Sequence, residues 1–197
     1  ELSWGDMAVL YRTNAQSRSI EESLVRWGIP YIVVGGLRFY DRREIKDLLA
    51  YLRLLVNPAD TVSLLRVINV PKRGIGKTTI QRLTDAANQL GIPLWDVVSD
   101  AEAVRSLGGR SARGLLQFCE LLHDLRRQVQ EVAPSELIQQ VMEKSGYVSE
   151  LIAEGTDEAE ERRRNLQELV NAALQYQEEN EEGDLEGFLA TAALSSD

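Results

Sequence analysis

The stretch V-I-N-V-P-K-R-G-I-G-K-T-T-I-Q-R-L, residues 67–83, joins two segments whose apolar residues recur at helical spacing. The first segment ends at a proline, and the second resumes just after a Gly-Ile-Gly turn. Two glycines around one apolar residue allow a tight turn in which Ile75 points inward and the next helix begins with unpaired N–H groups. Because Lys72, Arg73 and Lys77 surround the turn, we expect it to bind the phosphate of a nucleotide or of a nucleic-acid backbone.

Three interpretations of this turn compete. Gly76-Lys77-Thr78 has the form of the end of a P-loop, but that pattern requires glycine at position 71, where this chain has proline. Proline removes a donor where the phosphate cradle would begin, and residues 64–70 have a helical pattern although a P-loop follows a strand. A helix-hairpin-helix type turn, whose amides and cations grip a duplex backbone without recognising its sequence, fits better. A plain helix-helix turn with solvated lysines is the third possibility.

Composition excludes several classes of protein. The 197 residues are 44% hydrophobic and 27% charged, which is typical of a globular protein of one or two domains. No apolar run approaches the roughly 20 residues of a membrane span, and no signal peptide opens the sequence, so we expect a cytoplasmic protein without a membrane partner. Cys119 and His123 are the only residues of their kinds, so an internal disulfide or a Cys/His metal cluster cannot be built.

The net charge of −9 is divided unevenly along the chain. Residues 1–82 contain 13 Lys and Arg against 8 Asp and Glu, whereas residues 83–197 contain 9 against 23. Basic charge therefore gathers where the turn lies, and the acidic half can serve solubility or repel DNA from the wrong face. The negative total does not exclude a nucleic-acid partner.

The first 40 residues have the pattern of a small strand-helix-strand unit. Residues 7–11 form a short apolar run typical of a buried strand, and residues 31–34 form a second. Between them, Asn14 is predicted to cap a helix that ends at Gly28. A unit this small cannot bury itself, so we expect it to belong to a larger sheet. Glu1 is not a natural start, which also indicates a fragment of a longer protein.

Polar residues follow the first predicted strand at the position where open α/β sheets place ligands. A guanidinium, a hydroxyl and an amide at Arg12, Thr13 and Asn14 suit phosphate and sugar contacts. Taken alone, Asn14 is interpreted as a helix cap rather than a ligand contact. After the second predicted strand, Gly35 and Gly36 form a plausible hinge, since two adjacent glycines absorb large backbone rotations.

From residue 41 onward the pattern is helical, so the predicted fold is mainly α. Asp41 and Glu44 are expected to form a capping box for a helix that ends before Asn57, with Ile45, Leu48, Leu49 and Leu52 on its buried face. Further helices are predicted at residues 62–67, 77–90, 111–129, 134–145, 157–180 and 185–194, with a short turn at 95–98.

Three blocks of sequence occur in a distinctive order. They are A-V-L-Y-R-T-N-A-Q-S-R (8–18), I-P-Y-I-V-V-G-G-L-R-F-Y-D-R-R-E-I-K-D (29–47) and N-V-P-K-R-G-I-G (69–76). Together they closely resemble UvrD/PcrA/Rep-type superfamily 1 DNA helicases: the first is similar to motif IV of that family and the second to the motif at its hinge. The resemblance implies that residues 1–40 are part of a RecA-like 2A domain and that residues 41–197 form a helical 2B insertion.

The resemblance also implies an enzyme, namely an ATP-dependent 3′–5′ helicase that unwinds DNA in repair or replication. The sequence contains no complete Walker A, no D-E-x-Q Walker B and no arginine-finger motif. ATP and Mg²⁺ would therefore bind elsewhere in the parent protein, and this fragment alone is expected to hold no cofactor and to be inactive. The implied partners are DNA at a single-strand/duplex junction, the remaining helicase domains, and repair proteins or a second helicase copy.

The resemblance also implies DNA-contact roles for particular residues. Arg12 and Asn14 match motif IV positions on the single-stranded track, and Lys46 falls where a basic residue near the duplex is plausible. The duplex-gripping turn corresponds to Lys72, Arg73, Gly74, Gly76, Lys77 and Thr78. We expect this fragment to be a duplex-binding and regulatory subdomain that rotates about Gly35-Gly36. The alternatives are a protein-interaction or autoinhibitory module whose acidic helical half docks partners, and an independent P-loop NTPase.

Overall fold

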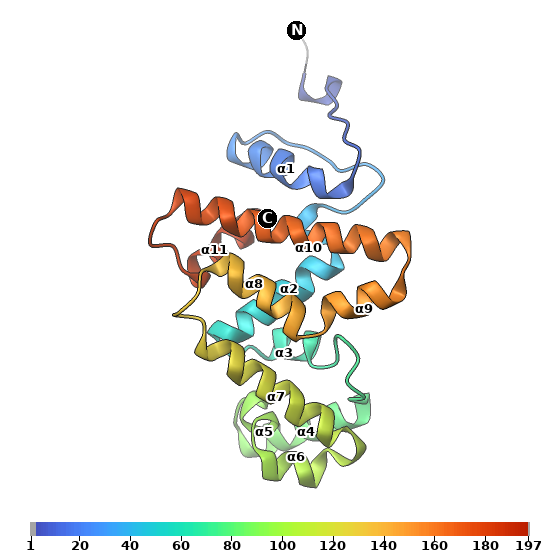
Figure 1. The fold of residues 1–197 in the computed structure, drawn as a ribbon, viewed down its shortest axis with the longest axis vertical. Helices are drawn as coiled ribbons and strands as arrows, with labels where there is room; N and C mark the ends of the chain where they lie inside the picture. Colours follow the sequence, from blue (N-terminus) through green and yellow to red (C-terminus); the bar gives the residue numbers. More distant parts are fainter. Residues whose placement is uncertain (1–2, 197) are drawn as a thin grey trace.

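The computed structural model describes residues 3–196, and all the regular structure in that range is helical (Figure 1). Glu1, on which the interpretation as a fragment depends, lies outside the described residues. Four short 3-10 helices are η1 (Trp4–Asp6), η2 (Asn14–Gln16), η3 (Phe39–Asp41) and η4 (Gly109–Ser111). The α-helices are α1 (Ser17–Arg26), α2 (Arg43–Val56), α3 (Thr61–Val67), α4 (Lys77–Leu90), α5 (Leu94–Val98), α6 (Ala101–Leu107), α7 (Ala112–Arg127), α8 (Pro134–Lys144), α9 (Tyr147–Glu154), α10 (Asp157–Glu179) and α11 (Leu185–Leu194).

The helices form an elongated body with two different ends (Figure 1). Helix α2 runs through the middle and packs against α3, α7, α8, α10 and α11. Helix α1 lies along the outer side of α10 near the N-terminus, whereas α4, α5 and α6 form the opposite end. The core is continuous between these ends and includes the fully buried rings of Tyr51, Phe118 and Phe188.

The predicted apolar face of α2 is confirmed, but its predicted cap is wrong. Ile45, Leu48, Leu49 and Leu52 are all buried, and the helix ends before Asn57, as expected. The N-cap is Arg42, which makes no side-chain capping bond. Asp41 lies in η3 instead. Glu44 is buried, and its carboxylate accepts a hydrogen bond from Asn165 on α10. A tertiary partner therefore replaced the local capping box.

The predicted strand-helix-strand unit is wrong for the described residues, which contain no strand. Residues 7–11 and 31–34 are irregular, and their apolar side chains face outward: Leu10 is 95% exposed and Ile32 is 85% exposed. A strand forms only where its N–H and C=O groups pair with a neighbouring strand, and neither segment has such a neighbour here. The predicted cap Asn14 is also wrong, because Thr13 and Gln16 form the capping box at this helix start.

The later helices mostly begin and end where their sequence signals predicted. Helices α4 and α11 have the predicted bounds, Asp60 caps α3, and Gly91 ends α4 in the left-handed conformation. Helices α6 and α9 were missed, because seven and eight residues carry little periodic signal. Within residues 3–196, no helix combines the length and the apolar character that crossing a membrane requires.

Candidate nucleic-acid interface

The basic turn of the sequence lies between α3 and α4, and we call residues 68–78, which are this turn and the first two residues of α4, the corner. Helix α3 packs mainly against α2 and α5, and α4 mainly against α5 and α6. Because the two helices do not pair along their lengths, the predicted helix-hairpin-helix is not supported. Within the corner Ile75 is only 2% exposed, as predicted, while Lys72, Gly74 and Gly76 are exposed. Gly74 has a φ of 71°, a left-handed conformation that favours glycine.

Several backbone amides of the corner, which the sequence predicted to be unpaired, donate hydrogen bonds to side chains. The Asn69 side-chain oxygen accepts hydrogen bonds from the amides of Arg73, at 2.8 Å, and Ile75, at 3.2 Å. The Asn69 side chain thereby connects the start of the corner to residues 73 and 75. The first turn of α4, which begins at Lys77, has no capping side chain.

The start of α7 contacts the corner at two residues, Ser111 and Gly114. The Ser111 hydroxyl, at the N-cap of α7, donates to the Gly74 carbonyl at 3.0 Å and accepts from the Gly76 amide at 3.3 Å. One turn further along α7, Gly114 lies against the carbonyl of Arg73, so closely that a Cβ would be 2.2 Å from that oxygen. Two residues of α7 therefore fix the position of the corner.

Arg73 points into the protein. Its guanidinium donates to the Tyr51 hydroxyl at 2.6 Å and lies over the rings of Tyr51 and Phe118. It also donates to four backbone carbonyls, at 3.1 to 3.4 Å, those of Val67, Ile68, Pro71 and Ser145. A phosphate contact would require breaking these bonds. The Arg73 guanidinium therefore connects the corner with α2, α7 and the end of α8.

Lys72 and Lys77 remain as the available cations of the predicted turn. Both are exposed, and within residues 3–196 neither has a carboxylate within 4.0 Å. Thr78, the next predicted contact residue, is exposed on the first turn of α4. The corner thus presents two lysines, a hydroxyl and the free amides of a helix start to solvent.

The other predicted DNA-contact residues belong to the segment before α1 and to the first turn of α2, and the segment before α1 lies at the opposite end of the body from α4 (Figure 1). Arg12 is exposed, whereas the Asn14 side-chain amide is hydrogen-bonded to Glu161 on α10. Lys46 on α2 pairs with Asp41 at 2.9 Å, and this bond holds the pKa of the Asp41 carboxyl below its usual range. The structure therefore does not bring the two groups of predicted residues together.

A set of buried and partly buried polar residues, which no sequence pattern predicted, joins α1, α2 and α10. We call it the polar joint. Arg18 of α1 is buried and pairs with Glu22 at 2.6 Å and with Glu168 of α10 at 2.7 Å. Burial alone would lower the pKa of Arg18, but the two carboxylates outweigh it and raise that pKa. The charged form is thus favoured by partners on both helices.

A second part of the joint lies at the start of α2. Arg42 donates to the Ser17 hydroxyl at 2.7 Å and to the Asn165 side-chain oxygen at 3.0 Å, and Asn165 donates to Glu44 at 2.7 Å. Here burial dominates and lowers the pKa of Arg42. The polar joint comprises Ser17, Arg18, Arg42, Glu44, Asn165 and Glu168.

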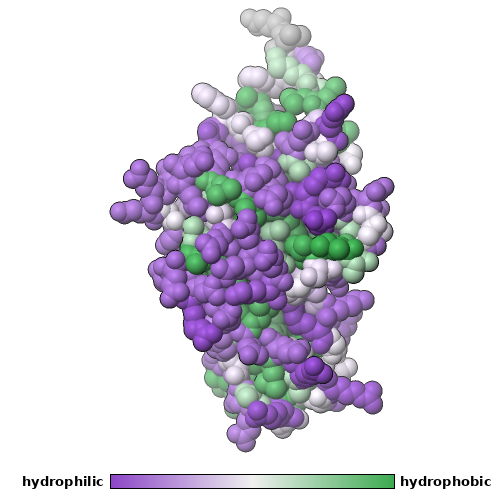
Figure 2. Space-filling model, in the orientation of Figure 1, coloured by the Kyte–Doolittle hydropathy of each residue, from purple (hydrophilic) through white to green (hydrophobic). Residues whose placement is uncertain are grey.

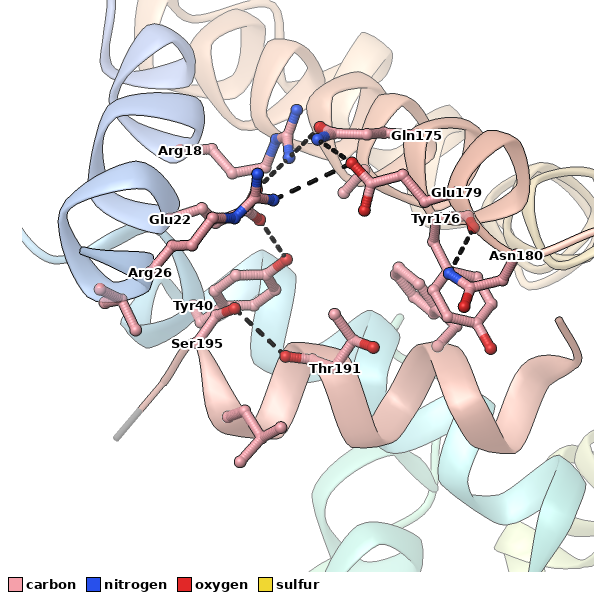
Figure 3. A pocket seen from close by; sticks show the side chains of 14 residues that line it. Arg18, Glu22, Arg26, Tyr40, Gln175, Tyr176, Glu179, Asn180, Thr191 and Ser195 are labelled. Carbon is pink, nitrogen blue, oxygen red and sulfur yellow. Dashed lines mark hydrogen bonds and ion pairs between the residues drawn. The ribbon is translucent and has the colours of Figure 1, made fainter. Parts of the chain in front are cut away.

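A cavity of about 310 Å³ lies beside the joint, between α1, α10 and α11 (Figure 3). Arg18, Tyr40 and Gln175 line it, but their polar groups have partners: the Tyr40 hydroxyl donates to Glu22 at 2.9 Å, and Gln175 bonds to Arg18 and Glu179. No group of three His, Cys, Asp or Glu in residues 3–196 could hold a metal ion. The structure thus offers no evident cofactor site in the described part of the chain.

Apolar side chains are exposed at the N-terminal end of the body (Figure 2). Large apolar side chains that are exposed together at one end of a protein commonly mark a contact with another protein surface. The exposed large apolar residues of this segment are Trp4, Met7, Val9, Leu10, Val25, Trp27, Ile32, Val34 and Leu37.

The chain belongs to the family described as the UvrD-like helicase C-terminal domain, which it matches over residues 2–197. The resemblance to superfamily 1 helicases is thereby confirmed at the level of the family.

Individual relatives are similar along the entire chain. It is 40% identical over 202 residues to the ATP-dependent DNA helicase PcrA of Leuconostoc citreum. The aligned region covers 100% of this chain and 27% of that protein. It is 40% identical over 194 residues to PcrA of Staphylococcus aureus strain Mu50, covering 98% and 26%, and 39% identical over 196 residues to PcrA of Staphylococcus epidermidis, covering 98% and 27%. The chain thus spans about a quarter of the length of these curated relatives.

Proposed function

We propose that this chain is the duplex-DNA-binding and regulatory part of an ATP-dependent 3′–5′ DNA helicase that acts in repair or replication in the cytoplasm. Three things support the proposal: the family, the helicase names of the relatives, and the exposed corner. Residues 1–40 would belong to the 2A motor domain and residues 41–197 to the 2B insertion. ATP and Mg²⁺ would be bound by parts of the enzyme outside this chain.

The observation that carries the proposal is the exposure of Lys72 and Lys77 without carboxylate partners in the described part of the chain. Two lysines, the Thr78 hydroxyl and the first amides of α4 are donors that suit phosphate oxygens and read no base sequence. Each phosphate contact releases counterions, so binding should weaken with salt by a slope of about 0.9 per contact on a log-log plot. Binding would therefore be sequence-independent and salt-sensitive.

The corner needs little rearrangement to bind, which favours affinity. Asn69 fixes two of its amides, Ser111 fixes a carbonyl and an amide, and the Arg73 guanidinium ties it to three helices. A loop ordered before binding does not lose conformational entropy during binding. Arg73 thus supports the interface indirectly, and the direct contacts fall to Lys72 and Lys77.

The proposed regulatory role is a rotation between the N-terminal segment and the helical body. Gly35 has a φ of 80°, and a Cβ added at Gly35 or Gly36 would meet no atom within 4 Å, so neighbours do not restrict a hinge there. The polar joint opposes rotation, since Arg18 and Glu168 connect the two parts. Arg12 and Asn14 would meet the single strand in a rotated state that frees Asn14 from Glu161. Lys46 would meet the duplex by exchanging Asp41 for a phosphate, since both residues follow the hinge and rotate together.

The test compares duplex binding by two double variants that each remove two positive charges. Fluorescence anisotropy of a labelled duplex at low salt should show about a tenfold or larger loss of affinity for Lys72→Ala/Lys77→Ala. The matched control is Arg127→Ala/Lys144→Ala, whose cations already pair with Asp124. Equal affinities of the two variants would reject the duplex role of the corner.

A protein-interaction or autoinhibitory module is the second candidate, favoured by the exposed apolar N-terminal segment and by exposed carboxylates on α10. In this case partners or a second helicase copy would dock without DNA contact by the corner. Reversing Glu158, Glu160 and Glu161 to Lys should then abolish partner or self-association, measured by analytical ultracentrifugation, while duplex affinity stays independent of Lys72 and Lys77.

A further inference from the structure

We propose that Asp47 of α2 is a positioning residue for duplex binding, because its carboxylate holds two elements that together fix the corner. The inference rests on the proposed function of the corner and adds to it a residue that would not touch DNA. Asp47 is only 3% exposed and lies within the buried length of α2. Burying a carboxylate is unfavourable unless partners surround it, so its partners identify what the residue holds in place.

Both oxygens of the Asp47 carboxylate have a partner on another helix. Oδ1 accepts a hydrogen bond from Nε of Arg66 at 2.8 Å, and Oδ2 accepts one from the Tyr147 hydroxyl at 2.7 Å. Arg66 is in the last turn of α3, two residues before the corner begins, and Tyr147 is the first residue of α9. Arg43 is a weaker partner, since its Nε lies 3.9 Å from Oδ2 and its side chain is exposed. Asp47 therefore joins α2 to α3 and α9.

The turn between α8 and α9 leads from Tyr147 back to the corner. The Tyr147 amide donates to the Ser145 hydroxyl at 3.2 Å, and the Ser145 carbonyl accepts from the Arg73 guanidinium at 3.3 Å. The contacts thus form a closed circuit. Asp47 holds the start of the corner through Arg66, and through Tyr147 it holds the turn that Arg73 contacts.

A second residue of α2, one turn further along, completes this support. Asp47 and Tyr51 are four residues apart and so lie on one face of the helix. The Tyr51 hydroxyl accepts from the Arg73 guanidinium at 2.6 Å. One face of α2 therefore holds both Arg66 and Arg73, which enclose the first half of the corner.

The Tyr147 hydroxyl is suited to its place in the circuit. Burial, together with the facing Asp47 carboxylate, raises the pKa of Tyr147, so the hydroxyl stays protonated and remains a donor. The consequence for binding falls on Lys72, which immediately precedes Arg73 in the chain and cannot move independently of it. A corner that moves freely would have to be ordered during binding, at a cost in affinity.

A role through position and a role through charge predict opposite effects of removing Asp47. Its carboxylate is negative, and a negative charge near a phosphate-binding surface weakens duplex binding by repulsion. If charge alone mattered, neutralising Asp47 would strengthen binding. Because Asp47 positions the corner, neutralising it should weaken binding instead.

The first test measures duplex affinity of the chain by fluorescence anisotropy at low salt, at a temperature where thermal unfolding shows every variant to be folded. Asp47→Asn should lower affinity about three- to tenfold, although it removes a negative charge. The matched control Asp85→Asn removes an exposed carboxylate on α4 and should bind with equal or higher affinity.

The second test breaks the link on the other side of the circuit. Tyr147→Phe keeps the ring in the core, and it should lower affinity about threefold. It should also speed up hydrogen exchange of the Arg73 and Ile75 amides, measured by NMR in the free chain. The matched control is Tyr40→Phe, because the Tyr40 hydroxyl also donates to a carboxylate, that of Glu22 at 2.9 Å, but beside the polar joint. This control should change neither the affinity nor the exchange of these two amides.

The outcomes separate this inference from the proposal on which it rests. Unchanged or higher affinity of Asp47→Asn and Tyr147→Phe, together with a loss for Lys72→Ala/Lys77→Ala, overturns the role of Asp47 and keeps the duplex role of the corner. Unchanged affinity of all three variants overturns both. Lower affinity with faster exchange throughout the chain also overturns the positioning role, because the substitution would then have destabilised the whole fold.

Discussion

The carbonyl oxygen of Arg73 lies against the backbone of Gly114, and a Cβ at position 114 would stand 2.2 Å from that oxygen. This close approach joins two segments that are 41 residues apart in the sequence, the corner and the start of α7. The neighbour is backbone, which cannot rotate aside as a flexible side chain would. The position of the basic corner therefore depends on the absence of one side chain.

Gly114→Ala should consequently displace the corner. We expect a loss of about 1 to 3 kcal/mol in the free energy of unfolding, as for other overpacked sites, together with weaker duplex binding. Urea unfolding measures the first and anisotropy the second. Gly5→Ala is the control, because its Cβ would meet only the Ser3 hydroxyl oxygen, at 3.6 Å. Full stability of Gly114→Ala would contradict the tight packing described here.

Arg73→Lys should destabilise the protein although it keeps the positive charge. Lysine has no planar fork and cannot serve Tyr51 and the four carbonyls at once, so buried acceptors lose their partners. We expect a loss of about 2 kcal/mol or more in the free energy of unfolding, measured in urea. Arg105→Lys, at an exposed position, is the control. If Arg73 instead contacted phosphate directly, Arg73→Lys would retain both its stability and most of its duplex affinity.

Arg18→Ala should release α1 from α10. The substitution leaves Glu22 and Glu168 facing each other without their shared cation, and breaking such a buried pair costs about 3 kcal/mol. We expect faster hydrogen exchange in α1 and faster proteolysis in the exposed segment after it, with α2 to α11 unchanged. Arg26→Ala on the same helix is the control, because its contact with Glu179 is exposed and 3.9 Å long. Equal exchange rates in the two variants would show that the polar joint does not hold α1.

The cap of α3 should make stability depend on pH. Partial burial opposes ionisation of Asp60, but hydrogen bonds from the Ser63 hydroxyl and amide outweigh it and lower the pKa below 3.8. A lowered folded pKa stabilises the protein above the unfolded pKa, and this stability is lost as the pH falls from about 4 through the folded pKa. Asp60→Ala should therefore cost about 1 kcal/mol at pH 7 and less at pH 3.

The matched variant for this prediction is Asp60→Asn, which keeps a good capping residue and cannot titrate. Its stability relative to Asp60→Ala should not change between pH 7 and pH 3, as measured by urea unfolding at both pH values. A difference between wild type and Asp60→Ala that stays constant over this range would contradict the lowered pKa of Asp60.

Much of the helical fold was predictable because its signals are local. The bounds of α4 follow from the glycines at both of its ends, and Asp60 identifies the start of α3. The segments 7–11 and 31–34 gave equally clear strand patterns, and both predictions were wrong within the described residues. Helical hydrogen bonds lie within one segment, whereas a strand requires a second strand that the sequence pattern cannot supply.

The location of the candidate site could be predicted from the sequence. The residues that form its exposed surface could be predicted only in part. Sequence alone identified a basic, glycine-bracketed turn and the inward direction of Ile75. It could not distinguish Arg73 from Lys72, because both are cations in the same turn and only the rings and carbonyls around Arg73 draw its guanidinium inward. It also gave no sign that Ser111 and Gly114 hold the turn.

The sequence by itself determined the longer helices, the apolar face of α2 and the location of the basic turn, since these depend on residues within a few positions of one another. Only the tertiary structure decided which cations face solvent and which polar residues are buried in the polar joint. The physical reason is that desolvating a charge is unfavourable unless partners surround it, and the partners of Arg18, Arg42 and Arg73 come from helices far away in the sequence.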